Sequence, residues 1–526
     1  MTAKNLSAAQ VRDLITSGDE IAILDLREWG VFGNGHLLFA VSLPLSHLET
    51  RVDDFVPRKD TKIVLCAAGD GDAHLVETGA ARLAAWGYTD INKLDGGLKG
   101  WEAAGFEVFS GVNVPSKAFG EFVEHTYDTP RMPAAEVKAM MDRGENMVVL
   151  DSRPMSEYHK MSIPMGIDCP GAELAYRVHD LAPDPNTTVI VNCAGRTRSI
   201  IGAQSLINAG IPNKVVALEN GTMGWHLAGF QLDYGKTAQF SDLSDAGKAK
   251  AQEVAQRVSK RFGVLTCSHA DLKSWQAEKG RTTYVLDVRN PSEYEAGHLP
   301  GCRYAPGGQL VQAWDRYVAV LGARIVLVDD DGVRATMTAS WMLQMGWKEV
   351  FVLKDAFKGQ SLVKGKHEPV LHAFANIKVD TVSDIPDGAV VIDLADSLTY
   401  RDGHVPGAWF AVRARLLESI KKIPDVPLTV VTSPDGVLAT LAAPELTTLG
   451  RKVAVLEGGN HAWKKAGKPM EQGFTNMADE TNDVWYRPYD MDDAQEGAMK
   501  QYLSWEINLI NQLERDGTTE FRAFPK

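Results

Sequence analysis

One short loop of the sequence combines residue types that could do covalent chemistry. It follows the predicted strand 189–192 and reads Cys193-Ala194-Gly195-Arg196-Thr197-Arg198. The next residue, Ser199, opens a predicted helix. A loop between a strand and a helix aims successive backbone N–H groups and the helix N-terminus at one point, which makes an anion cradle. The helix end and the two guanidinium groups should lower the pKa of Cys193 below the free value of about 8.5. We therefore predict that Cys193 is a thiolate nucleophile rather than a buried structural cysteine.

The length of this loop distinguishes two chemistries that suit a thiolate in an anion cradle, sulfur transfer and phosphate monoester hydrolysis. Cysteine phosphatases need a C-x5-R spacing, so that the loop encloses a tetrahedral phosphoryl group and the arginine pairs with its oxygens. Here Arg198 makes the spacing C-x4-R, and the next residue is Ser199. The tighter ring favours a single sulfur atom, held on Cys193 as a persulfide.

The loop belongs to a unit that recurs four times along the chain. In each copy a short apolar run ends in an aspartate, and a second apolar run ends 40 to 42 residues later. The aspartates are Asp25, Asp151, Asp287 and Asp393, and the later positions are Cys66, Cys193, Asp329 and Ser433. Three copies also carry a Gly-His pair between the two runs, whereas the second copy has Ser162 in that place. Self-similarity at a nearly constant register indicates tandem copies of one fold.

Each copy is expected to be a small α/β domain, in which a parallel sheet is flanked by helices. Runs of Val, Ile and Leu alternate with amphipathic stretches such as 133–144 and 199–210, the pattern of strands alternating with helices. A proline-free segment rich in Ala, Lys and Gln lies between copies two and three and predicts a helical connector. The chain therefore resembles two pairs of domains.

After the fourth copy, the sequence predicts a helical tail that docks on the body of the protein. Apolar residues recur there at helical spacing, at Met499, Leu503, Ile507 and Ile510. The predicted segments are domain 1 (1–115), domain 2 (130–238), the connector (239–262), domain 3 (263–365), domain 4 (372–475) and the tail (476–526).

Composition excludes several classes of protein. A chain of 526 residues exceeds what one hydrophobic core supports, and 44% hydrophobic with 23% charged residues is ordinary for globular domains. The net charge of −13 repels phosphate backbones and anionic lipid. Five cysteines are too few for a disulfide framework and indicate a reducing compartment. We expect a soluble, cytoplasmic protein with no nucleic-acid or membrane partner.

The four copies resemble rhodanese domains in the Asp-x-Arg strand end, the Gly-His-x-Pro-Gly segment and the cysteine-initiated loop. The whole chain is similar to bacterial proteins built from four such domains, over residues 5 to about 475. The resemblance implies a sulfurtransferase in which Cys193 takes the outer sulfur of a donor, releases sulfite and passes the sulfur to a thiophilic acceptor such as cyanide or a thiol. It also implies that Asp151 and Arg153 lie near the loop as supporting residues. For Arg153 we favour an internal ion pair with Glu157 over direct catalysis.

Charge suggests which sulfur donor this loop would take. Arg196 and Arg198 would give the thiosulfate dianion two charge-assisted partners, whereas mercaptopyruvate-type relatives tend to have a neutral loop. Thiosulfate is therefore the expected sulfur donor. The substrate-binding residues are expected to be Ala194, Gly195, Arg196, Thr197, Arg198 and Ser199. No metal or cofactor is expected, and the partners are a small-molecule donor and acceptor, with a protein acceptor left open. The alternative is a persulfide carrier or scaffold whose degenerate domains bind a partner.

The other three copies lack parts of the loop. Cys66 is followed by Asp70 and Asp72 without an arginine, and nearby acid raises the pKa of a thiol, so we expect Cys66 to accept little sulfur. The residues Asp329 and Ser433 offer no thiol and cannot form a persulfide. The histidines of the Gly-His pairs are predicted to hydrogen-bond in turns rather than bind metal: His36, His298 and His404. The remaining cysteines are predicted to be packed, with a relay role left open for the first of them: Cys169, Cys267 and Cys302.

Overall fold

The computed structural model describes residues 3–372, 374–491 and 495–524, with only the backbone at Asp70. The chain divides into two compact units, which are described separately. Unit 1 comprises residues 1–11, 22–112 and 369–486, and unit 2 comprises residues 12–21, 113–368 and 487–526. The first repeat is thus grouped with the fourth, and the second with the third. The helical connector does not separate two pairs, because it packs on helices of both the second and the third repeat.

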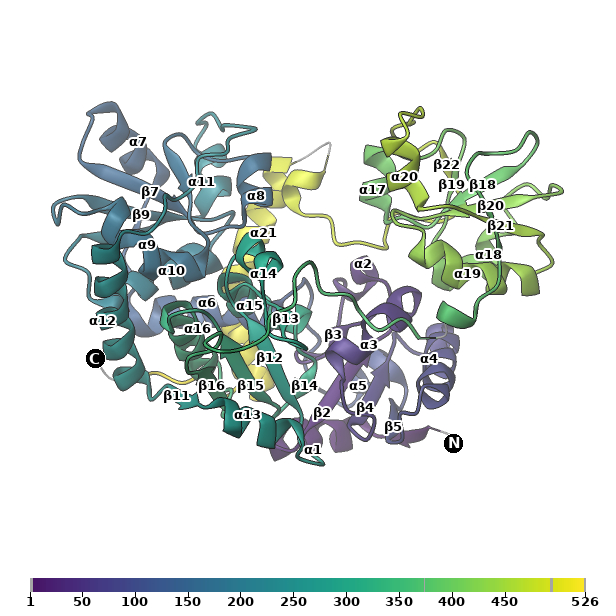
Figure 1. Ribbon diagram of the computed structural model, residues 1–526, viewed down its shortest axis with the longest axis horizontal. Helices are drawn as coiled ribbons and strands as arrows, with labels where there is room; N and C mark the ends of the chain where they lie inside the picture. The colour runs from purple at the N-terminus through teal and green to yellow at the C-terminus, as the bar shows by residue number, and fades with distance from the viewer. Residues whose placement is uncertain (1–2, 373, 492–494, 525–526) are drawn as a thin grey trace. The chain divides into compact units, whose positions relative to one another are not determined.

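All four repeats form the predicted architecture, an α/β domain with a small parallel sheet flanked by helices. In domain 2 the strand order is β6-β10-β9-β7-β8, and neighbouring strands run parallel. Figure 1 shows α7 and α11 on one face of this sheet and α9 and α10 on the other. The strands are β6 (Arg131–Met132), β7 (Met147–Asp151), β8 (Gly166–Asp168), β9 (Thr188–Asn192) and β10 (Val215–Leu218). The helices are α7 (Ala134–Asp142), α8 (Met155–Lys160), α9 (Gly171–Leu181), α10 (Thr197–Ala209) and α11 (Gly221–Leu227).

Domain 3, in the same unit, repeats this order as β11-β16-β15-β12-β13. Its strands are β11 (Leu265–Cys267), β12 (Thr283–Asp287), β13 (Arg303–Tyr304), β14 (Val320–Leu321), β15 (Arg324–Val328) and β16 (Val350–Leu353). Its helices are α13 (His269–Gln276), α14 (Pro291–Ala296), α15 (Gly307–Gln312), the 3-10 turn η3 (Trp314–Arg316) and α16 (Val333–Gln344).

In unit 1 the strands of domain 1 follow the order β1-β5-β4-β2 with β3 beside β2, and those of domain 4 the order β17-β21-β20-β18-β19-β22. The domain 1 elements are β1 (Lys4–Leu6), α1 (Ala8–Ser17), β2 (Ile21–Asp25), α2 (Trp29–Phe32), β3 (Val41–Ser42), η1 (Leu45–His47), α3 (Leu48–Phe55), β4 (Lys62–Cys66), η2 (Asp70–Asp72), α4 (Ala73–Ala85), β5 (Ile91–Leu94) and α5 (Gly97–Ala103). The later elements are η4 (Phe374–Asn376), β17 (Asp380–Val382), β18 (Val390–Asp393), α17 (Ser397–Asp402), β19 (Trp409–Phe410), η5 (Arg413–Arg415), α18 (Leu416–Ser419), β20 (Thr429–Thr432), α19 (Val437–Thr448), β21 (Val453–Leu456), α20 (Gly459–Lys465) and β22 (Asn476–Met477).

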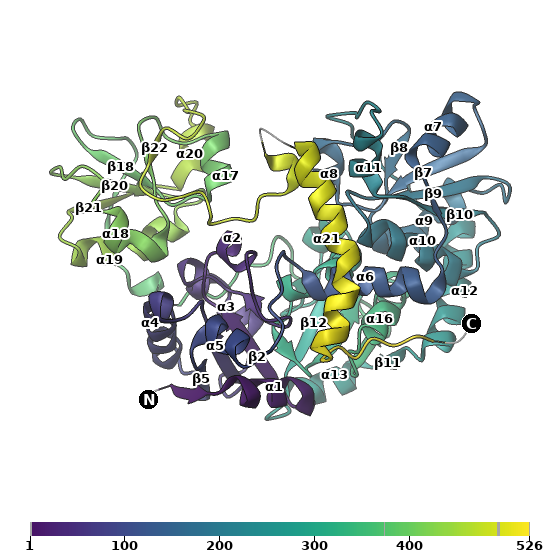
Figure 2. The same ribbon diagram turned by 180° about the vertical axis from the view of Figure 1, so that it is seen from behind.

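Among the described residues of unit 2, three helices lie outside the repeats. They are α6 (Val114–Tyr127), the connector helix α12 (Asp245–Phe262) and the tail helix α21 (Gln495–Asp516), which follows the turn η6 (Pro488–Asp490). Figure 2 shows α21 crossing α6, and the two helices are in contact. Within the described residues, no helix is both long enough and apolar enough to cross a membrane.

The tail helix docks as predicted, but its buried face is only partly the predicted one. Met499 and Leu503 are buried, whereas Ile507 is 44% exposed. The buried side continues through Glu506, Leu509 and Leu513. The apolar pattern misassigned this face because the sequence gives no reason to bury an acidic residue such as Glu506.

Candidate active site

Cys193 lies where the sequence places it, between the carboxyl end of β9 and the start of α10. The strand is buried at four of its five residues, and the helix begins at Thr197. The N–H groups of Thr222 and Met223 donate to the carbonyls of Cys193 (2.8 Å) and Ala194 (3.0 Å), which fixes the loop to the turn before α11. Gly221 in that turn has φ of 55°, and a Cβ there would lie 2.4 Å from the Cys193 carbonyl oxygen. Only glycine permits this close approach.

The loop directs a backbone N–H at its first side chain in three of the four domains. In domain 3 the Ala335 N–H donates to Asp329 Oδ2 at 3.0 Å, and in domain 4 the Ala439 N–H donates to Ser433 Oγ at 3.3 Å. The residue at the same offset in domain 2 is Ser199, whose N–H is hydrogen-bonded to Cys193. The backbone donor at this offset is therefore a property of the repeat, although most side chains of the loop differ between these domains.

Burial changes the acidity of Cys193 in the opposite direction to the prediction. The residue is 2% exposed, and burial raises the pKa of its thiol above the ordinary value. The Arg198 guanidinium and the hydrogen bonds to Ser199 lower it, and Glu506 raises it further. The thiol lies 3.5 Å from Ser199 Oγ, which itself donates to the Arg196 carbonyl at 2.8 Å. The expectation of a lowered pKa was wrong because it counted the cations and ignored desolvation.

Arg196 is held by helix α6 and does not face an open anion site. Its Nε and one terminal nitrogen donate to the two carboxylate oxygens of Glu121, each at 2.7 Å, and it also pairs with Glu124. The arginine is 5% exposed. Two carboxylates therefore offset its charge. The expectation that Arg196 and Arg198 together bind one dianion does not fit this structure.

Arg198 is the cation that acts on Cys193. It donates to both oxygens of Glu157, at 3.0 and 2.8 Å, and to the side chain of Gln309 in domain 3 at 3.1 Å. The Arg198 charge lowers the pKa of Glu157 to about 2, against the raising effect of burial. Glu157 therefore pairs with Arg198, and the expected Arg153–Glu157 pair was wrong.

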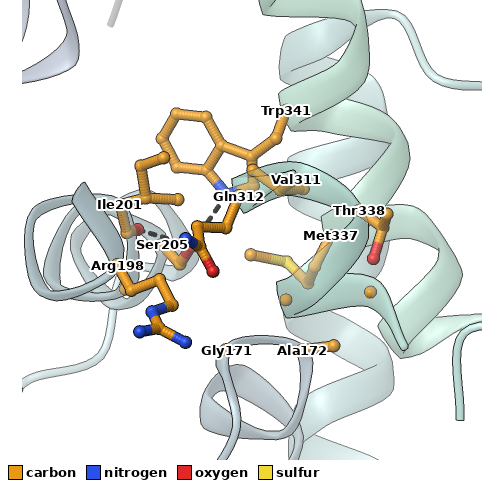
Figure 3. Close-up of a pocket in the computed structure, with 13 residues that line it drawn as sticks. Gly171, Ala172, Arg198, Ile201, Ser205, Val311, Gln312, Met337, Thr338 and Trp341 are labelled. Atoms are coloured by element: carbon orange, nitrogen blue, oxygen red, sulfur yellow. Dashed lines mark hydrogen bonds between the residues drawn. The ribbon is translucent and has the colours of Figure 1, made fainter. Parts of the chain in front are cut away.

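A small cavity between domains 2 and 3 extends from Arg198 (Figure 3). Its lining includes Gly171, Ser205, Gly307 and Trp341, and the Trp341 indole donates to Ser205 at 2.8 Å. The volume of about 30 Å³ holds only one or two water molecules. Cys193 does not line this cavity, so it is not the binding site of a sulfur donor.

Asp151 and Arg153 form a buried ion pair next to the Cys193 loop. Arg153 donates to both carboxylate oxygens of Asp151 (2.8 and 2.7 Å) and to the Met161 carbonyl (2.7 Å). Asn192, the residue before Cys193, donates to Asp151 at 2.8 Å. Equivalent hydrogen-bonded pairs occur in domain 1 between Asp25 and Arg27 and in domain 3 between Asp287 and Arg289. The pair therefore belongs to the architecture of the repeat, because it also occurs in domain 3, which has no thiol at the loop position.

The Cys193 loop is covered by segments that its sequence motif does not predict. Ala194 and Met223 pack against Met499 and Leu503 of α21. The Thr197 hydroxyl donates to Glu506 at 3.3 Å, and Gly195 lies under Tyr502 and Glu506. No spacing in the loop signals these contacts, because the partners lie about 300 residues away in the chain.

The remaining candidates occupy structural positions. Cys66 is buried, and its burial raises the pKa of its thiol well above the ordinary value. The nearby Asp25 carboxylate raises this pKa further. Each histidine of the Gly-His pairs hydrogen-bonds to a backbone carbonyl as predicted: His36 to Leu37, His298 to Tyr294 and His404 to Tyr400. The other three cysteines are buried as predicted: Cys169, Cys267 and Cys302.

Only one cluster of the described residues brings three potential metal ligands together, the carboxylates of Asp329, Asp330 and Asp331. These carboxylates already have protein partners. Asp329 accepts from the Gly332 N–H at 2.7 Å, Asp330 pairs with Arg334 at 2.8 Å, and Asp331 pairs with Lys248 at 3.3 Å. The cluster is therefore part of the internal hydrogen bonding of domain 3.

Comparison with known proteins agrees with this geometry. A family model of the rhodanese-like domain matches residues 7–104, 133–228, 268–361 and 379–466, and the chain belongs to the rhodanese family. It is 46% identical to a solved thiosulfate sulfurtransferase from Pseudomonas aeruginosa, covering 99% of this chain and 100% of that one with a TM-score of 0.94. It is also 32% identical over 78 residues to the uncharacterized protein YqhL of Bacillus subtilis (strain 168), which covers 15% of this chain and 60% of that protein. Fold and family are those of the rhodanese-type sulfurtransferases.

Proposed function

We propose that the protein transfers the outer sulfur of thiosulfate, through a persulfide on Cys193, to a thiophilic acceptor such as cyanide or a thiol. The observation that carries this proposal is the environment of the Cys193 thiol, with the Ser199 N–H and the Arg198 guanidinium acting on it. At Cys66, the other thiol at this position of the repeat, the raising effect of Asp25 exceeds the lowering effect of Arg27. Cys193 is thus the better stabilised thiolate.

The reaction begins when the thiol loses its proton, and Arg198 and the Ser199 N–H stabilise the resulting anion. Cys–S⁻ attacks the outer sulfur of thiosulfate, the S–S bond of the donor breaks, and sulfite leaves with the bonding electron pair. The enzyme then holds Cys–S–S⁻, whose outer sulfur lies in the anion cradle. Cyanide attacks that sulfur, thiocyanate leaves, and Cys–S⁻ is restored. Charge is conserved in both steps.

Two observations support thiosulfate as the donor. The P. aeruginosa relative, similar over its whole length, is a thiosulfate sulfurtransferase by name. Arg198 lies close enough to Cys193 for its charge to lower the thiol pKa, and a bound dianion would gain from the same charge. One arginine, rather than two, is expected to bind the donor, because Arg196 is committed to α6.

Burial of Cys193 keeps a second function open, that of a persulfide carrier whose acceptor is a protein. The residue is 2% exposed and its neighbour Ala194 packs against helix α21, so sulfur held on Cys193 would exchange slowly with free small acceptors. A carrier would load one sulfur per chain from thiosulfate and release it slowly to cyanide.

The test is steady-state sulfite release from thiosulfate in the presence of cyanide. We expect turnover in the wild type and none in Cys193→Ser, because a hydroxyl cannot hold a transferable sulfur. A single stoichiometric burst of sulfite without turnover would favour the carrier. Absence of even that burst would refute both functions.

A further inference from the structure

Helix α21 lies outside the four rhodanese domains, yet it places polar groups directly over the Cys193 loop. Its Tyr502 and Glu506 lie above Gly195, where a Cβ would be 3.4 Å from the Tyr502 ring and 3.2 Å from Glu506 Oε2. Any larger side chain at residue 195 would fill the space between the loop and Oε2. Glycine at this position therefore leaves the carboxyl group of Glu506 facing the loop.

The two oxygens of the Glu506 carboxyl group have different surroundings. Oε1 accepts hydrogen bonds from the Tyr502 hydroxyl at 3.0 Å and from the Thr197 hydroxyl at 3.3 Å. Oε2 is buried and has no hydrogen-bond partner among the residues that the structure describes. Glu506 is only 2% exposed. Because Oε1 is an acceptor twice over, a proton on this carboxyl group resides on Oε2 and makes it a donor aimed at the loop.

The surroundings of Glu506 favour its protonated form. The titratable groups around it are Lys117 and Glu121 of α6, Cys193 and Arg196 of the loop and Tyr502 of its own helix. Arg198 and Tyr489 of η6 act in turn on Tyr502. Burial raises the pKa of Glu506, and Lys117 opposes that effect. Glu121 and Glu124 offset the charge of Arg196. A buried donor that lacks an acceptor is costly unless a ligand completes it.

We propose that Glu506 is a substrate-binding residue of the Cys193 site, which donates a hydrogen bond from Oε2 to an oxygen of a sulfur oxyanion, thiosulfate or the departing sulfite. The identity of this ligand rests on the proposed function. As a neutral acid, Glu506 completes the shell of the anion without adding like charge. As a carboxylate it repels the dianion, so binding weakens as pH rises through the pKa of Glu506.

The test is calorimetric binding of thiosulfate to Cys193→Ser protein, in which no sulfur can be transferred. On this background, Glu506→Gln keeps an N–H donor near the position of Oε2, and Glu506→Ala removes it. Glu514→Gln, at an exposed position of the same helix, is the matched control. We expect Glu506→Ala to raise the Kd by about ten- to a hundredfold, the range for a hydrogen bond to a charged group. The Gln variant and the control should bind like the parent.

The pH dependence of the same Kd separates binding from folding. It should rise with pH in the parent and stay flat in Glu506→Gln, whose amide does not titrate. Unchanged or tighter binding by folded Glu506→Ala, a rise that persists in Glu506→Gln, or no thiosulfate binding by the parent would overturn the proposal. The expected pattern together with no turnover in the wild type would instead refute the proposed function and leave the Glu506 assignment standing.

Discussion

Replacing Arg198 by alanine should affect stability and chemistry separately. The change removes the hydrogen-bonded partner of Glu157, whose side chain is 15% exposed and would remain as a largely buried carboxylate. Breaking a buried ion pair in this way costs about 3–5 kcal/mol. Burial raises the pKa of Glu157, but Arg198, with smaller contributions from Arg487 and Arg153, lowers it from the ordinary 4.5 to about 2. The net shift corresponds to about 3 kcal/mol of stabilisation at neutral pH, of which Arg198 supplies the largest part.

The sign of this contribution fixes its pH window. The pKa of Glu157 is lower in the folded protein than in the unfolded chain, so the stabilisation is complete above about pH 4.5 and is lost as pH falls toward 2. Denaturant unfolding at several pH values measures it. Arg198→Ala should be less stable than the wild type at pH 7, and the difference should shrink with acid.

The chemical effect should survive when stability is restored. Arg198 lowers the pKa of the Cys193 thiol, so its loss should move the pH dependence of Cys193 alkylation to higher pH. The kcat/KM for thiosulfate should fall by about ten- to a hundredfold, and less for an uncharged donor. The double variant Arg198→Met with Glu157→Gln removes both charges and should recover stability without recovering activity. Recovery of activity in that variant would show that Arg198 acts only through the fold and would refute this reasoning.

Three further predictions test the loop itself. Cys66→Ser should leave sulfite release nearly unchanged while Cys193→Ser abolishes it, and a loss in Cys66→Ser would give domain 1 a part in the reaction. Gly221→Ala should destabilise the protein by about 1–3 kcal/mol in thermal melts and lower activity, since its Cβ would lie 2.4 Å from the Cys193 carbonyl oxygen. The control Gly210→Ala meets no atom within 4 Å and should bear only the backbone strain of a positive φ. The wild type should not hydrolyse an aryl phosphate above background, and efficient hydrolysis would contradict the loop-length argument.

The sequence predicts the parts of this protein that repeat or lie close together in the chain. The recurrent Asp and Cys positions predict four α/β domains, and the 193–199 segment predicts a cysteine between a strand and a helix. The partners of the arginines were not predictable in this way. Glu121 and Glu124 reach Arg196 from α6, more than 70 residues upstream, and nothing in the loop signals them.

The raised pKa of Cys193 and the position of Glu506 could not be predicted from the sequence for a related reason. Helix ends and cations are visible in a sequence, whereas desolvation depends on which distant segments cover the site. The tail helix supplies that cover, and it buries Glu506 on the face where an apolar pattern would place only Leu, Ile or Met.

Intact-protein mass spectrometry after incubation with thiosulfate, followed by peptide mapping without reductant, tests the central claim most directly. We predict the addition of one sulfur atom per chain, located on Cys193 and removed by cyanide. Cys193→Ser should gain no sulfur under the same conditions. Sulfur located on another cysteine, or an unmodified wild-type chain, would contradict the assignment of Cys193 as the sulfur-carrying nucleophile.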